Sequence, residues 1–165
     1  MNRLLPIGRI SPQRGFTLFE LIVAISILVL VFGLAIAGFN TFNKRERLRQ
    51  AGLTLKANLR FAQTKALSVD KPTSGCTAFT GMRISFTATS YTISHTCTEG
   101  VVGTGETVTM QPGITLSPVP ATFTFIPLKG STSLPAGQTL SITNTMFTYS
   151  LAISGNGDIS DQGIE

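Results

Sequence analysis

The sequence predicts an α+β protein in which one long N-terminal helix packs on a C-terminal antiparallel β-sheet domain. The first observation is an uncharged, almost wholly apolar run over residues 21–39, which as a helix matches a hydrocarbon core of ~30 Å. The second is the recurrence of apolar residues at steps of three and four after this run, which is typical of an amphipathic helix. The third is the alternation of apolar and polar residues beyond Pro72, which is typical of β-strands.

The helix is expected to run from about Thr17 to Ser68. No proline lies between Gln13 and Lys71, and Asp70-Lys71-Pro72 is a typical helix end. One face of its second half carries the apolar positions Leu48, Ala51, Leu55, Leu59, Ala62, Ala66 and Val69. A neighbouring strip carries the basic positions Arg45, Arg49, Lys56 and Arg60. The first half is therefore apolar all round, and the second half is apolar on one face.

The polar half of the chain is expected to form an antiparallel sheet that covers the apolar helix face. Alternation predicts a hairpin of residues 82–86 and 91–97, joined by the turn Thr87-Ala88-Thr89-Ser90. Further strands are expected at Glu106–Gln111, Ala121–Leu128, Gln138–Thr143 and Phe147–Ser154. Glycine and proline turns separate them, and Gly155-Asn156-Gly157-Asp158 is expected to be a turn before a short tail.

Charge and cysteine content limit the classes of function. Residues 1–15 hold three arginines and no acid, and residues 44–71 hold eight basic side chains against two acids. Residues 72–165 hold two basic side chains against five acids, so the basic character flanks the apolar run and gives little support to nucleic-acid binding by the polar half. If the apolar run anchors or exports the chain, Cys76 and Cys97 face an oxidising compartment and are expected to form a disulfide; two separately buried thiols are the alternative.

One acid, Glu20, lies at the start of the apolar stretch. An ionised side chain inside a bilayer costs roughly 2.5–3.5 kcal/mol, and no Lys or Arg lies between Arg14 and Lys44 to pair with it. The string Arg14-Gly15-Phe16-Thr17-Leu18-Phe19-Glu20, followed by an apolar run and a Ser/Thr-rich β region, resembles the class III signal of type IV prepilins and type II secretion pseudopilins. The resemblance implies the type IV pilin-like fold.

The resemblance also implies a processing pathway. Residues 1–15 would be the leader, which a membrane prepilin peptidase removes after Gly15 before methylating the new terminus at Phe16. Residues 16–43 would be the transmembrane and filament-core half of the helix, 44–71 its amphipathic half, and 72–165 the periplasmic or extracellular β-rich domain. Cleavage frees an α-amine that is largely cationic near neutral pH, so Glu20 can pair with the Phe16 amine of an adjacent subunit and fix the axial register. The alternative is that Glu20 reaches the headgroup boundary by itself.

The second half of the helix extends the resemblance to GspH/FimT-type minor pilins. The stretch from Leu55 to Leu67 is similar to their Leu-x-x-x-Leu-Arg-x-Ala-Arg-x-x-Ala pattern, with Gln63 in place of the second arginine. Residues 125–130, Phe-Ile-Pro-Leu-Lys-Gly, are similar to their Phe-x-Pro-x-Gly turn with altered spacing. The chain departs from many members in having no Trp, and in having no Pro in the span.

The expected function is therefore structural. The chain would be a minor pilin or pseudopilin, held in the bacterial inner membrane by a single pass with its N-terminus cytoplasmic, and then assembled into a type IV pilus or a type II secretion pseudopilus. Its expected partners are other pilin subunits, the prepilin peptidase and methyltransferase, the inner-membrane assembly platform and membrane lipid. The basic strip on the helix is expected to contact lipid headgroups or neighbouring subunits.

Three alternatives remain open from the sequence. Ala35-Ile36-Ala37 resembles an ordinary signal-peptide cleavage site, which would make the chain a secreted binding protein that begins after Ala37. Some minor pilins of this type take up DNA, so DNA is a possible but unfavoured partner. A calcium loop is a weaker alternative, because Asn156, Asp158 and Asp161 have part of the required spacing. No enzymatic activity, metal or cofactor is expected, because His95 is the single histidine and no Ser-His-acid set, Walker loop or zinc spacing occurs.

Overall fold

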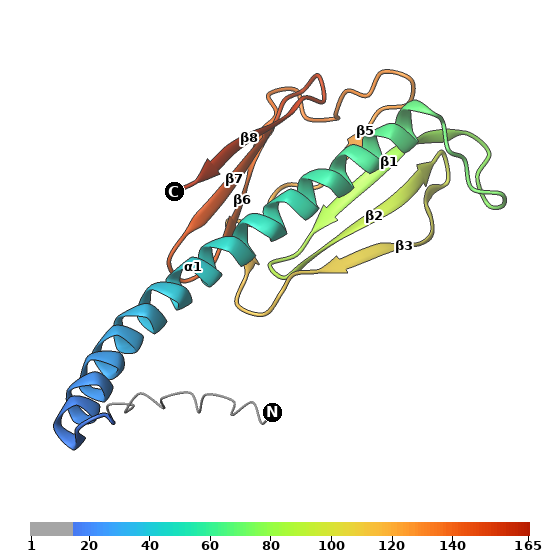
Figure 1. The fold of residues 1–165 in the computed structure, drawn as a ribbon. Helices are drawn as coiled ribbons and strands as arrows, with labels where there is room; N and C mark the ends of the chain where they lie inside the picture. The colour runs from blue at the N-terminus through green and yellow to red at the C-terminus, as the bar shows by residue number, and fades with distance from the viewer. Residues whose placement is uncertain (1–14) are drawn as a thin grey trace, which may run out of the picture. The chain divides into compact units, whose positions relative to one another are not determined.

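A computed structural model of the chain describes residues 15–165, apart from the side chains of residues 34–37. Over these residues the element order is helix α1 (Leu18–Leu67) followed by strands β1 (Phe79–Phe86), β2 (Ser90–Cys97), β3 (Gly100–Thr109), β4 (Thr115–Leu116), β5 (Phe123–Phe125), β6 (Gln138–Thr143), β7 (Thr148–Ile153) and β8 (Ile159–Ile164) (Figure 1). The contacts within the chain form two compact units that meet between Asn40 and Thr41. The α+β class predicted from the sequence is confirmed.

The first unit contains the apolar half of α1. Its large apolar side chains from Leu18 to Phe32 are each between 40% and 76% exposed, so they pack on nothing in the described chain. Among the described residues, α1 is the one helix long and apolar enough to cross a membrane, by length and composition. This half of α1 presents the apolar surface that a lipid bilayer or a neighbouring helix can cover.

The second unit is built on the apolar face of the rest of α1. The predicted face is buried: Leu48, Leu55, Leu59, Ala62 and Ala66 are 0% exposed. Val69 is the exception, since α1 ends at Leu67 and Val69 is 37% exposed with a φ of 52°. Its N–H donates to the carbonyl of Ala66 (3.2 Å) in a turn that closes the helix, which takes its side chain off the helical face.

The strands form two four-stranded antiparallel sheets, whereas the sequence predicted one. The first has the order β3-β2-β1-β5 and contains the predicted hairpin, in which Ile84 pairs with Ile93 and Phe86 with Tyr91. The second has the order β4-β6-β7-β8. Both sheets contribute to one core with α1, and its fully buried side chains include Phe125 from the first sheet and Leu151 from the second. Figure 1 shows both sheets beside the second half of α1.

The outer strands account for most of the difference. β8 occupies what the sequence suggested was a short tail, and β3 begins at Gly100, six residues before the expected start. Both strands lie at a sheet edge and are mostly exposed, and of the six residues of β8 one, Ile159, is buried. Edge strands of this kind are held by backbone pairing rather than by an alternating apolar face, so alternation does not reveal them.

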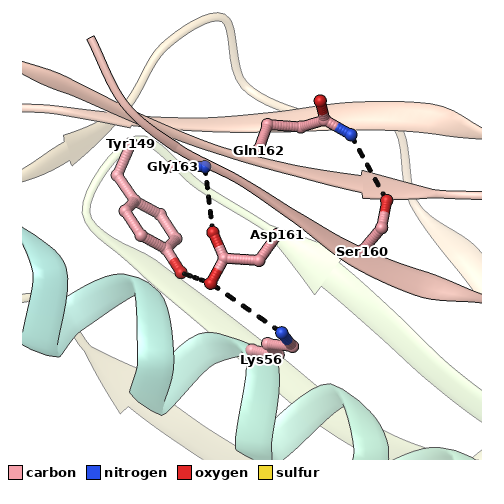
Figure 2. A network of polar contacts seen from close by, with 6 residues as sticks. All are labelled: Lys56, Tyr149, Ser160, Asp161, Gln162 and Gly163. Carbon is pink, nitrogen blue, oxygen red and sulfur yellow. Dashed lines mark hydrogen bonds and ion pairs between the residues drawn. The ribbon is translucent and has the colours of Figure 1, made fainter.

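Two polar contacts attach the second sheet to α1. The carboxylate of Asp161 on β8 accepts hydrogen bonds from the Tyr149 hydroxyl (2.5 Å) and the Gly163 N–H (2.9 Å), and lies 3.8 Å from the Lys56 ammonium on α1 (Figure 2). The hydrogen bond from Tyr149 lowers the pKa of Asp161. The pKa of Tyr149 is raised, mainly because its hydroxyl is buried and also because it donates to the Asp161 carboxylate.

The second contact lies farther along α1. There the Gln63 amide nitrogen donates to the carbonyls of Gly130 (3.0 Å) and Gly157 (2.9 Å).

Candidate processing and assembly site

The residues predicted to direct processing lie together at the start of α1. Gly15, Phe16 and Thr17 precede the helix, and the side chain of Phe16 is 80% exposed. Thr17 is the N-cap: its hydroxyl oxygen accepts a hydrogen bond from the Glu20 N–H (3.2 Å), and its carbonyl accepts one from the Leu21 N–H (3.2 Å). Cleavage after Gly15 would therefore leave a free terminus one residue before the helix cap.

The surroundings of Gly15 in the described structure do not require a glycine. Nothing in the described structure lies within 4 Å of a Cβ built on it. Packing within residues 15–165 therefore does not select glycine at this position.

Glu20 lies in the first turn of α1, and its side chain is exposed. No Lys, Arg or His within residues 15–165 forms an ion pair with it. Its large neighbours are apolar and exposed, with Phe19 at 76% and Leu21 at 55%. The carboxylate is favourable at a helix N-terminus, where the backbone N–H groups point toward it. It has no cationic partner in the described part of the chain, and a cation from another molecule can approach it freely.

The other residues singled out in the sequence belong to the second unit. Cys76 and Cys97 form a disulfide, with their Cα atoms 5.5 Å apart. His95 on β2 lies 3.9 Å from the carboxylate of Asp70 and beside the ring of Phe79.

The residues considered for calcium are not gathered into a site. The Asp161 carboxylate accepts a hydrogen bond from Tyr149 and pairs with Lys56. Asp158 lies in the turn before β8, where its backbone N–H donates to the Ser154 hydroxyl. Among the described residues, no group of three or more His, Cys, Asp or Glu side chains spaced to hold a metal ion includes Asp158 or Asp161. The geometry gives no support to the calcium alternative.

The helix cap also has a signature in the sequence. Thr17-Leu18-Phe19-Glu20 has the S/T-x-x-E spacing of a capping box, and half of that motif, the bond from the Glu20 N–H to the Thr17 hydroxyl, is present. The partners of Asp161 and Gln63 had no comparable sign, because they lie far away along the chain.

Comparison with known proteins agrees with this geometry. A family model described as the prokaryotic N-terminal methylation motif matches residues 10–36. The match supports a type IV prepilin-like protein. It covers the residues on both sides of the Gly15–Phe16 bond and much of the apolar run, and it leaves the β domain outside. No curated protein and no solved structure matches the chain.

Proposed function

We propose that this chain is a minor pilin or pseudopilin of the GspH/FimT type, a structural subunit rather than an enzyme. A prepilin peptidase removes residues 1–15, Phe16 is N-methylated, and the mature subunit leaves the inner membrane to join a type IV pilus or a type II secretion pseudopilus. Before assembly the chain crosses the membrane once, with its N-terminus cytoplasmic and its β domain on the other side.

The observation that carries this proposal is the match of residues 10–36 to the methylation motif at the start of an uncovered apolar helix. The exposed Gly15–Phe16 bond supports the cleavage position. Within residues 15–165 no cation pairs with the carboxylate of Glu20, which supports the proposed register, in which it pairs with the terminal amine of Phe16 on a neighbouring subunit. The disulfide between Cys76 and Cys97 supports a β domain outside the cytoplasm.

The two alternatives receive less support. Three cations of the helix, Arg49, Lys56 and Lys65, have carboxylate partners at 4.0, 3.8 and 3.3 Å, which lowers the positive charge offered to DNA. Cleavage after Ala37 would divide α1, which runs from Leu18 to Leu67. A signal peptide removed there would also leave the mature chain starting inside a helix.

The cleavage position is tested by replacing Gly15 with leucine and expressing the chain with its cognate peptidase. We expect unprocessed precursor that remains in the membrane, and a wild-type product whose N-terminal sequence starts at Phe16. The matched control is Gly33→Leu, because Gly33 is also free of contacts within 4 Å and lies in the same apolar helix. Normal processing of the Gly15 variant would refute the assigned site.

The register is tested by replacing Glu20 with valine. We expect normal membrane insertion and processing but much lower incorporation into sheared filaments, because the valine cannot pair with the amine of its neighbour. Ser26→Val is the control, since Ser26 is exposed in the same helix and its hydroxyl donates only to the Ile22 carbonyl (2.8 Å). Equal incorporation of the two variants would refute the pairing.

A further inference from the structure

A cleft in the second unit brings together two basic side chains and two loops of the β domain. It has a volume of about 190 Å³ and lies between Lys44 and Arg47 of α1, the loop 112–114 and the loop 144–145. Lys44 and Arg47 are three residues apart and so lie on the same side of the helix. No acidic residue lines the cleft, and neither cation forms an ion pair with a carboxylate of the described residues.

The walls of this cleft are held by specific hydrogen bonds. The side-chain N–H of Asn144 donates to the Lys44 carbonyl (3.0 Å), which attaches the loop to α1. The side-chain oxygen of Asn144 accepts from the N–H groups of Met146 (2.9 Å) and Phe147 (2.8 Å), which fixes the turn of that loop. The Lys44 ammonium lies 3.7 Å from the sulfur of Met146, whose side chain is 54% exposed. The cleft is thus preformed, with an exposed apolar side chain beside it.

Two other cations of the same helix segment lie on another side of α1, in a pocket that also contains acidic residues. Arg45 and Arg49 line a second pocket, together with Glu46 and Asp161. Arg49 lies 4.0 Å from Glu46. An anion would meet two carboxylates there, but none in the cleft of Lys44 and Arg47.

We propose that the cleft of Lys44 and Arg47 binds the phosphate of an anionic phospholipid headgroup while the subunit is in the membrane. This rests on the proposed membrane anchoring. Lys44 and Arg47 follow Phe39, the last residue of the apolar run, by five and eight residues, or about 8 and 12 Å of helix. That distance places their long side chains within reach of the headgroup layer. Basic side chains at this depth attract anionic lipid.

The test uses the full-length protein in neutral detergent and measures bound lipid by native mass spectrometry. Phosphatidylglycerol is titrated against phosphatidylcholine as the zwitterionic control, with inorganic phosphate as a competitor. The K44Q/R47Q variant should bind phosphatidylglycerol about thirtyfold more weakly, since each cation contributes about fivefold. The K44R/R47K variant should bind normally, which separates loss of charge from loss of folding.

The matched control is R45Q/R49Q, which removes the same charge from the same helix segment. It should retain most of the phosphatidylglycerol affinity. Equal losses in the two double variants, equal binding of the two lipids, or complete displacement by millimolar inorganic phosphate would each overturn the proposal. Membrane flotation and peptidase processing are followed in parallel: their failure in the wild-type chain would refute the proposed function, whereas normal processing without a lipid preference would refute only the headgroup site.

Discussion

Gln63 offers a sharp test of how the second unit is held together. Its amide nitrogen donates to the carbonyls of Gly130 and Gly157, so one side chain of α1 holds both the loop after β5 and the turn before β8. Both glycines are buried, and an added Cβ at Gly157 would meet the Gly130 carbonyl and the Gln63 nitrogen.

Replacing Gln63 with alanine removes both hydrogen bonds. Each neutral bond contributes about 0.5–1.5 kcal/mol, so the free energy of unfolding should fall by about 1–3 kcal/mol. Gln63→Arg should be tolerated better, because a guanidinium also donates. Gln63→Glu should be at least as harmful as alanine at neutral pH, because a carboxylate cannot donate to either carbonyl.

The assay is urea unfolding of the full chain in neutral detergent, followed by tyrosine fluorescence. The chain has no Trp, and its two tyrosines, Tyr91 and Tyr149, are buried at 1% and 2% exposure in the second unit. The urea midpoint of the alanine variant should fall by about 1 M, given a typical slope of ~1–3 kcal/mol per M. The control is Thr64→Ala, whose hydroxyl is exposed and donates within α1 to the Arg60 carbonyl. Equal midpoints for the two alanine variants would refute the argument.

Three further predictions concern the same unit. Gly52→Ala should destabilise it by about 1–3 kcal/mol, measured by the same unfolding, because the new Cβ would overlap the ring of Tyr149 and force a shift in a packed core. The pKa of Asp161 is lowered in the folded state, so the ionised carboxylate stabilises the fold fully above pH ~4, and this stabilisation is lost as the pH falls through the pKa of the folded state. Asp161→Asn should therefore reduce the fall in melting temperature at acid pH, measured over a pH series. Reducing the disulfide between Cys76 and Cys97 should lower stability by roughly 3 kcal/mol for a closed loop of this size, and an unchanged melting temperature in dithiothreitol would contradict this.

The parts of the fold that the sequence predicts correctly depend on local pattern. The apolar face of α1 repeats every three to four residues, and the hairpin of β1 and β2 alternates around a polar turn, so each can be found within a short window. β6 matches its predicted bounds, Gln138–Thr143, for the same reason. The division into two sheets has no local signature. It depends on β1 pairing with β5 and β6 pairing with β4, which are long-range choices.

The candidate functional residues also divide into those found by a local motif and those brought together only by the fold. Gly15, Phe16 and Glu20 form a linear motif within six residues, which a single sequence is enough to reveal. The cleft of Lys44 and Arg47 is different, because its second wall comes from Asn144, 100 residues farther along the chain. The sequence shows that Lys44 and Arg47 are basic, but the basic strip that it predicts consists of Arg45, Arg49, Lys56 and Arg60. The structure instead separates Lys44 and Arg47, whose cleft has no acidic lining residue, from Arg45 and Arg49, whose pocket is also lined by Glu46 and Asp161.

The exposure of the first half of α1 determines what kind of partner this chain needs. Apolar side chains from Leu18 to Phe32 remain at least 40% exposed around the helix, a larger apolar surface than soluble monomers usually present. Lipid can cover such a surface, and so can the same helix of a neighbouring subunit, because both are apolar. Under the proposed function the two environments differ at Glu20, since lipid tails offer its carboxylate no cation, whereas a processed neighbour would offer the amine of Phe16. Under the proposed function this one acid would favour transfer from lipid to filament, and it would do so only after the bond following Gly15 has been cut.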